Sequence, residues 1–195
     1  PFFLSIANVQ TNIEPAKEKA GKVIFCLYFV SVSKNIRNFA GMNDSHTIYH
    51  GSNVKVEKPE ILVSGFYKDF GFGFYCTNLE KQAQKWALTK RGASMVSVYS
   101  YQQKEGLQVL SFPKMTDEWL DFIVDCRCGK RHSYDIVEGP MADDQIWDYV
   151  EDYMEGVITR EAFGVLAKFK YPTHQIVFCT QKALETLTYE RSYSL

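Results

Sequence analysis

Short apolar runs with a period of two mark the predicted strands of this chain. Val96 and Val98 alternate with polar residues within 94–101, and a second run covers 107–112 after a Gln-Gln-Lys-Glu-Gly turn. Two such runs joined by a short glycine-containing turn predict an antiparallel hairpin. Further short strands are predicted at 48–52, 74–76, 133–137 and 175–179.

Apolar residues spaced by three and four positions predict the helices. One helix is expected over about 79–90 and ends at Gly92. One face of this helix is expected to carry Leu79, Ala83, Trp86 and Ala87. Thr77 and Glu80 fit a capping box, in which each side chain binds an unpaired backbone N–H as the helix begins. Other helices are predicted at 117–127, 144–154, 159–169 and 182–187.

The order of these elements bears on the fold class. Strands and helices are interspersed, and the predicted hairpin is antiparallel. A doubly wound sheet would instead require parallel strands joined by helices throughout. The sequence therefore predicts an α+β fold, with mixed and antiparallel strands and flanking helices.

The first 41 residues differ from the rest of the chain. Residues 23–32 are almost wholly apolar and follow three lysines, as in a secretory signal, but they are too few to span a bilayer, which takes about 20. Met42 stands just before the first predicted strand. We expect 1–41 to be a leader or upstream extension outside the domain, and 42–195 to be the domain. Alternatively, 22–33 forms an extra strand or helix packed on it.

Composition sets further limits on function. The 195 residues are 46% hydrophobic, enough for one substantial core, and carry a formal net charge of -1. A broad basic surface for nucleic acid or anionic lipid is therefore not expected, nor is a membrane partner, although a local basic patch is compatible with this charge. Five cysteines without the spacing of a disulfide scaffold favour reduced thiols and a cytoplasmic location.

Two glycine-containing segments carry the candidate chemistry. His50-Gly51-Ser52 ends one predicted strand, which leaves a polar ring beside an unobstructed backbone. Gly71-Phe72-Gly73 precedes the strand that contains Tyr75. The third glycine and helix start of the dinucleotide-binding Rossmann fingerprint are missing here, which argues against dehydrogenase chemistry.

Together with the aromatic Trp86, these segments resemble the histidine-tyrosine class of ADP-ribosyltransferases, which includes the poly(ADP-ribose) polymerases and diphtheria toxin. The resemblance implies a fold of split mixed and antiparallel sheets, with NAD as the substrate. It implies that His50 binds a ribose hydroxyl and that the Gly51 backbone holds the nicotinamide carboxamide. It further implies that Tyr75 and Trp86 enclose the nicotinamide ring. Ser52 and Gly73 belong to the same two motifs and are assigned to the NAD site with them.

Gln175 is the main departure from the pattern of this class, which has a Glu at the start of a late strand. Cleavage of the nicotinamide–ribose bond develops positive charge on the sugar, and a fixed anion stabilises that charge better than a neutral amide. The resemblance therefore implies single ADP-ribose transfers without chain elongation. Asp143 and Asp144 are candidates for the missing carboxylate. Their alternative role is to cap the helix that follows and compensate its dipole.

A narrower similarity extends over about 48–187, including the aspartate pair, and is to a bacterial domain of unknown function, family 3990. We therefore expect an NAD-dependent mono-ADP-ribosyltransferase, with His50, Tyr75 and Gln175 as its catalytic residues. The ADP-ribose acceptor would be a protein, a nucleic acid or water. The alternative is a catalytically silent domain that binds NAD, ADP-ribose or a protein. A toxin-like role would add an antitoxin or immunity partner.

Other chemistries receive less support from the sequence. Cys126, Cys128 and His132 form a C-x-C-x3-H cluster that lacks the second ligand pair of a structural zinc site, so no metal is expected. A Cys-His nucleophile would need Cys76 or Cys179 to lie beside His50 or His174, and the sequence gives no sign of that proximity.

Overall fold

The structure is a computed structural model that describes residues 45–63, 68–142, 144–167 and 172–195. Seven strands and five helices form within these residues. The mixture of one antiparallel and one mixed sheet with helices confirms the predicted α+β class. The elements occur in the order β1 (His46–Ser52), β2 (Phe74–Cys76), α2 (Glu80–Leu88), β3 (Met95–Tyr101), β4 (Val109–Ser111), α3 (Asp117–Arg127), β5 (Ile136–Gly139), α4 (Asp144–Met154), α5 (Arg160–Ala167), β6 (Gln175–Phe178), α6 (Gln181–Leu184) and β7 (Leu187–Ser194).

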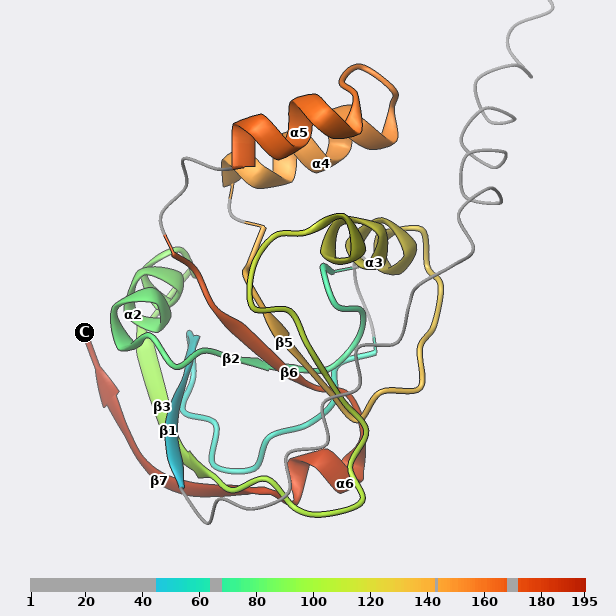
Figure 1. Cartoon of the computed structure of the whole chain (residues 1–195). Helices are drawn as coiled ribbons and strands as arrows, with labels where there is room; N and C mark the ends of the chain where they lie inside the picture. The colour runs from blue at the N-terminus through green and yellow to red at the C-terminus, as the bar shows by residue number, and fades with distance from the viewer. Residues whose placement is uncertain (1–44, 64–67, 143, 168–171) are drawn as a thin grey trace, which may run out of the picture. The chain divides into compact units, whose positions relative to one another are not determined.

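The first sheet has the order β1-β3-β7 and is antiparallel throughout. Its central strand β3 is almost entirely buried, and a bulge interrupts its pairing with β7 between Val98 and Tyr99. Helix α2 packs on one face of this sheet (Figure 1). Ala83 and Ala87 of the helix form a buried cluster with Val96 of β3.

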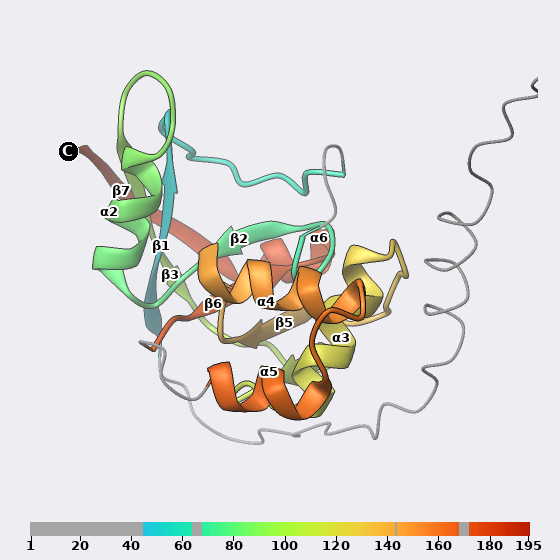
Figure 2. The same cartoon turned by 90° about the horizontal axis from the view of Figure 1, so that it is seen from above.

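The second sheet has the order β2-β6-β5-β4, and only the pair β4 and β5 is parallel. Side chains alternate between its two faces, as the pleat of a strand requires. Val137 and Val177 pack against the helices α3 and α4, whereas Ile136 and Ile176 pack toward the first sheet. The second sheet is therefore a middle layer, with α3, α4 and α5 on one side and the first sheet on the other (Figures 1 and 2).

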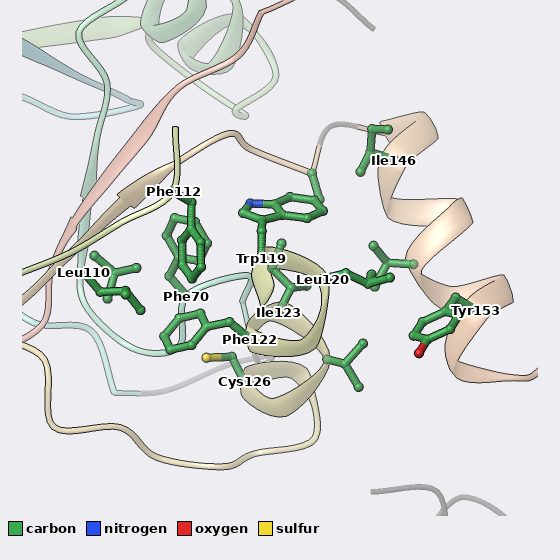
Figure 3. Close-up of a cluster of buried hydrophobic side chains, with 14 of the residues drawn as sticks. Phe70, Leu110, Phe112, Trp119, Leu120, Phe122, Ile123, Cys126, Ile146 and Tyr153 are labelled. Atoms are coloured by element: carbon green, nitrogen blue, oxygen red, sulfur yellow. The ribbon is translucent and has the colours of Figure 1, made fainter. Parts of the chain in front are cut away.

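Helix α3 contributes most of the larger core. Thr116 caps its start by accepting a hydrogen bond from the backbone N–H of Trp119 over 3.3 Å. Trp119 is fully buried, and its indole N–H donates to the carbonyl of Pro140 over 3.1 Å. Figure 3 shows Phe70 and Phe112 beside Phe122 of this helix. Buried aromatic rings of this size supply much of the apolar area removed from water on folding.

The predicted hairpin of 94–101 and 107–112 is wrong. β3 belongs to the first sheet, while β4 runs parallel to β5 in the second. The 102–108 segment carries the chain from one sheet to the other, and Asp135 holds its end by accepting a hydrogen bond from the backbone N–H of Gln108 over 2.8 Å. Local alternation predicted both strands but not their partners, because pairing is fixed by the core they share.

The predicted capping box at Thr77 and Glu80 is also wrong. α2 begins at Glu80, and Leu79 occupies the cap position without a side-chain hydrogen bond. Thr77 is held extended by a backbone bridge to Tyr49, with N···O distances of 2.8 and 2.9 Å. The Glu80 carboxylate accepts a hydrogen bond from the hydroxyl of Tyr193 instead, over 2.6 Å. The hydroxyl of Thr77 keeps only a local contact ahead of the helix, accepting from the backbone N–H of Leu79 over 3.0 Å.

The C-terminal prediction is only partly right. The helix expected at 182–187 is the single turn α6, capped by the hydroxyl of Thr180. The last strand, β7, was not predicted. The proposed leader 1–41 lies outside the described residues, as do Asp143 and 168–169 of the helix predicted at 159–169. Among the helices of the described ranges, none has the length and apolar character needed to cross a bilayer.

Candidate functional site

His50 lies where the two sheets meet. Its ring stacks on Phe74 with centroids 4.5 Å apart, and its Nδ1 lies 2.7 Å from the backbone carbonyl of Tyr75. A carbonyl oxygen only accepts, so Nδ1 carries the proton. Burial, opposed in part by that hydrogen bond, lowers the pKa of His50 from its ordinary value of 6.5. The ring is therefore neutral at neutral pH, and Nε2 remains a hydrogen-bond acceptor.

Tyr75 connects His50 to the turn before β2. Its hydroxyl donates to the carbonyl of Gly71 over 2.7 Å and accepts from the backbone N–H of Phe70 over 3.2 Å. Burial raises the pKa of Tyr75 well above its ordinary value, so the phenol stays protonated. The Nζ of Lys68 lies 4.8 Å from the centroid of the ring. The phenol is thus held in one orientation, with a cation on its face.

Gly51 and Gly73 have packing roles that the sequence did not predict. A Cβ on Gly51 would lie 2.1 Å from the carbonyl oxygen of Ala83, so glycine lets α2 lie directly on β1. A Cβ on Gly73 would lie 2.5 Å from a methyl group of Val177. Both glycines are therefore required by the packing, whatever ligand the site binds.

Ser52 ends β1 with a local contact. Its hydroxyl donates to the backbone carbonyl of Val54 over 2.5 Å and accepts from the backbone N–H of the same residue over 3.1 Å. Such a turn is a common use of serine at a strand end. The contacts of Ser52 are accordingly those of a turn residue.

Trp86 lies on α2, whose buried residues are Ala83 and Ala87. Its side chain is half exposed, and the Nζ of Lys90 lies 3.9 Å from the centroid of its ring. Leu79 of the same predicted face is also exposed. Between the described side chains there is no ring contact from Trp86 to Tyr75, and each ring has an ammonium group on its face. The enclosure of nicotinamide by these two rings stays a prediction.

Gln175 is buried at the start of β6, and its contacts fix the orientation of its amide. Nε2 donates to Oδ2 of Asp69 over 3.1 Å and to the carbonyl of Pro140 over 3.2 Å. Both partners are acceptors, so the nitrogen of the amide must face them. The amide therefore behaves as a donor toward a buried carboxylate, a role that an ionised Glu would not fill.

Asp69 and Arg127 form a buried ion pair that sequence reasoning missed. Nη2 of Arg127 donates to Oδ1 of Asp69 over 2.7 Å, and both side chains are almost fully buried. The other oxygen of Asp69 also accepts from the backbone N–H of Ala142 over 2.9 Å. Arg127 ends α3, where a basic residue ordinarily compensates the helix dipole, so its position gave no signal of this pairing.

The guanidinium of Arg127 is enclosed by α4. Its Cζ lies 3.5 Å from the centroid of the Trp147 ring, and Nη1 lies 3.7 Å from Oε1 of Glu151. Among the described residues, Nε and Nη1 have no hydrogen-bond partner. The Arg127 side chain thus joins α4 to the carboxylate that orients Gln175.

The backbone of His174 is hydrogen-bonded to α2 at the start of β6. The side-chain amide of Gln82 donates to the carbonyl of His174 over 2.5 Å and accepts from its backbone N–H over 3.0 Å. Nδ1 of His174 accepts from the backbone N–H of Asn78 over 3.3 Å, and burial lowers its pKa. This pairing sets the position of Gln175 relative to the helix that follows Tyr75.

The contacts described so far place the predicted residues in two linked groups. His50 belongs to the first and Gln175 to the second, and Tyr75 joins them through its carbonyl on one side and the 69–71 turn on the other. A model of one protein family, described as a protein of unknown function (DUF3990), matches residues 46–189. The chain belongs to the DUF3990 family. Comparisons with curated proteins and with solved structures found no match.

The matched DUF3990 region includes every candidate site residue. Asp144 is the first residue of α4, and Asp143 lies outside the described residues, so the supporting role suggested for this pair stays a prediction. The lysines that cover the two aromatic rings, Lys68 and Lys90, were not predicted as site residues. Surface lysines are common, and only the fold shows which ring each of them covers.

The cysteine and histidine cluster of this DUF3990 chain does not assemble a metal site. Nε2 of His132 donates to the carbonyl of Phe70 over 3.1 Å, and burial raises the pKa of Cys126. No group of three metal-ligand side chains occurs among the residues described. Cys76, Cys126 and Cys179 are free thiols in the described part of the chain.

Cys76 and Cys179 are poor nucleophiles. Cys76 is buried, and burial raises its pKa well above the ordinary value. Burial likewise raises the pKa of Cys179 to about 12. A thiolate is the reactive form of cysteine, so neither thiol is activated at neutral pH.

Proposed function

We propose that this DUF3990 chain is a mono-ADP-ribosyltransferase that cleaves the nicotinamide–ribose bond of NAD and passes ADP-ribose to a macromolecular acceptor. One observation carries the proposal. His50 is held neutral, with Nδ1 bound to the Tyr75 carbonyl and Nε2 left as an acceptor. That is the protonation state needed to accept a hydrogen bond from a ribose hydroxyl, the role that the resemblance to the histidine-tyrosine class assigns to it.

The reaction requires one bond to break and one to form. The bond from ribose C1′ to nicotinamide breaks with its electron pair leaving on nicotinamide, while an acceptor oxygen or nitrogen bonds to C1′ and releases its proton. Positive charge develops on the sugar in between. The amide nitrogen of Gln175 is already hydrogen-bonded to Asp69 and Pro140, so Gln175 can interact with this positive charge only through the dipole of its amide oxygen. Arg127 neutralises Asp69, so slow, single transfers are expected.

The acceptor and cellular partners follow from the same proposal. A protein side chain or a nucleic acid would receive the ADP-ribose, and water would give simple hydrolysis. If the enzyme is a toxin of the bacterial cytoplasm, an antitoxin or immunity protein would be its partner. Labelled NAD added with a cell lysate identifies the acceptor class, because nuclease and protease treatments remove the label from different products.

A second candidate function is a catalytically silent domain that binds NAD, ADP-ribose or a protein. The contacts of Gln175 favour it, since an amide held by a buried carboxylate can serve stability alone. The ammonium groups over Tyr75 and Trp86 favour a domain that binds ADP-ribose or a protein, because the oxidised nicotinamide ring is itself a cation.

Nicotinamide release measured by mass spectrometry tests the proposal. The wild-type chain should release nicotinamide from NAD, and His50→Gln should abolish release because it removes the ring that holds the ribose. His46→Gln is the matched control, since His46 is an exposed residue of the same strand. Equal release by His50→Gln would overturn the assignment of His50. No release by folded wild-type protein, with NAD or ADP-ribose binding retained, would favour the silent domain.

A further inference from the structure

Strand β7 forms one edge of the first sheet, and none of the described strands pairs with its outer side (Figure 1). It runs over eight residues, Leu187–Ser194, and none of them is proline. The other sheet edges are shorter or partly bridged. β2 and β4 have three residues each, and β1 is bridged to β2 at Tyr49 and Thr77. A long edge without proline offers its backbone groups to another strand.

The hydrogen bonds to β3 determine which backbone groups of β7 point outward. In an antiparallel pair, hydrogen-bonded residues alternate with residues whose N–H and C=O groups point away from the partner strand. Beyond one end of β7, the N–H of Leu195 donates to the carbonyl of Ser94 over 3.0 Å. Beyond the other end, the N–H of Gln102 donates to the carbonyl of Thr186 over 3.2 Å. Alternation inward from these two bonds, along the register on either side of the bulge, gives the outward residues Leu187, Tyr189, Ser192 and Ser194.

The four outward residues are placed symmetrically about the middle of β7, the peptide bond between residues 190 and 191. A second copy of β7 that runs antiparallel about this point meets the first with outward groups facing outward groups, as a two-fold interface requires. The bulge lies at the same midpoint in both copies, so it leaves the two edges in step. The resulting hydrogen-bonded pairs are Leu187 with Ser194 and Tyr189 with Ser192, each formed twice.

The side chains at the midpoint are complementary to themselves. Glu190 and Arg191 are both exposed, and among the described residues neither forms an ion pair. In the two-fold arrangement Glu190 of each copy lies opposite Arg191 of the other, and opposite charges across a strand pair stabilise it. A shift of the register by one residue would bring two glutamates or two arginines together. The charges therefore favour a second copy in this register.

We propose that β7 pairs with β7 of a second copy, about a two-fold axis between Glu190 and Arg191, so that two three-stranded sheets become one continuous sheet. Strand addition of this kind gains its affinity from backbone hydrogen bonds and its specificity from side chains. The inference goes beyond the proposed function and does not depend on it, because His50 and Gln175 lie on other strands.

Light scattering of the purified chain over a range of concentrations tests this dimer. The wild type should reach the mass of two chains as the concentration rises. Glu190→Arg brings arginines together and Arg191→Glu brings glutamates together, so each variant alone should dimerise at least about tenfold more weakly. Mixed in equal amounts, the two variants regain opposite charges and should form a mixed dimer. Glu60→Arg, a charge reversal at an exposed position between β1 and β2, is the matched control and should dimerise like the wild type.

Hydrogen exchange followed by NMR gives a second measurement, at single residues. The N–H groups of Tyr189 and Ser192 should exchange slowly in the wild type and rapidly in Glu190→Arg, whereas that of Tyr193, which faces β3, should stay slow in both. A wild-type mass of one chain at every concentration overturns the proposal. A dimer that Glu190→Arg leaves intact also overturns it, because that dimer forms through another surface. Neither measurement involves NAD, so the result is separate from the test of nicotinamide release.

Discussion

The side-chain amide of Gln175 donates a hydrogen bond of 3.1 Å to the buried carboxylate of Asp69. The resemblance to the histidine-tyrosine class would make Gln175→Glu a way to restore a missing catalytic anion. The contacts predict a different result. A glutamate at this position would direct a second carboxylate at Asp69 and at the carbonyl of Pro140, both of which are acceptors.

Gln175→Glu is expected to lower the free energy of unfolding by about 2–4 kcal/mol at neutral pH, because it buries an unpaired charge. The introduced carboxyl would have a pKa raised above its unfolded value of about 4.3. A group of this kind destabilises the fold increasingly as the pH rises through that range. Urea unfolding in mild acid and at neutral pH measures the effect. Gln181→Glu, the same change at an exposed position, is the control. Equal stabilities of the two variants would contradict the assigned orientation of the amide.

Arg127→Met is expected to cost about 3–5 kcal/mol of unfolding free energy, because it leaves Asp69 charged and buried without its partner. Adding Asp69→Asn should recover part of the loss. Denaturant unfolding of the single and double variants measures this coupling, and Arg131→Met changes an exposed arginine for comparison. If the second substitution only added to the damage, the two residues would not act as a pair.

The stability of the fold should decrease in mild acid. Burial lowers the pKa of His50, His132 and His174 in the folded state, so the unfolded chain takes up protons first as the pH falls. Their contribution is complete above the unfolded value of about 6.5 and is lost as the pH falls through it toward the folded values. Each histidine contributes a slope of at most about 1.4 kcal/mol per pH unit.

His50→Gln removes one of these three histidines, so the free energy of unfolding should fall less between neutral pH and mild acid. Urea unfolding at several pH values measures this difference. NMR of the ring protons should give His50 a midpoint below 6.5 in the folded protein. A midpoint above that value would mean that His50 is stabilised as a cation, which would end its assignment as a neutral acceptor.

Gly51→Ala should destabilise the protein by about 1–3 kcal/mol, because the new methyl group meets the backbone of α2 and the helix must move. Thermal unfolding measures the loss. Gly164→Ala in α5 gives the opposite expectation: its added methyl meets nothing, and alanine favours a helix by about 0.5–1 kcal/mol. An unchanged melting temperature of the Gly51→Ala variant would show that α2 can accommodate a methyl group against β1.

Sequence patterns predicted the elements better than their arrangement. Helix α3 matches its predicted range because its signals are local, namely an apolar face and a threonine cap. The pairing of β4 with β5 was missed because the short turn after β3 suggested a hairpin, whereas the partner of a strand is chosen by the core. β7 was missed because its exposed and half-buried positions give little periodic signal.

The site was predicted unevenly for the same reason. His50 and Tyr75 come together as the motifs implied, but through the backbone carbonyl of Tyr75. Trp86, expected to hold nicotinamide with Tyr75, is half exposed and has the ammonium group of Lys90 on its ring, a contact that no motif predicted. Asp69 and Arg127 are 58 positions apart, and no spacing rule relates them. Long-range ion pairs of this kind emerge only when the chain is folded.

The narrow junction between the two sheets has a mechanical consequence. Tyr49 and Thr77 join β1 to β2 by one pair of backbone hydrogen bonds, so a small strain can part the strands there more easily than along a full ladder. Helix α2 spans this junction. It packs directly on β1 at Gly51 and is hydrogen-bonded to the start of β6 through Gln82 and His174. Tilting that one helix would open or close the seam in which His50 lies.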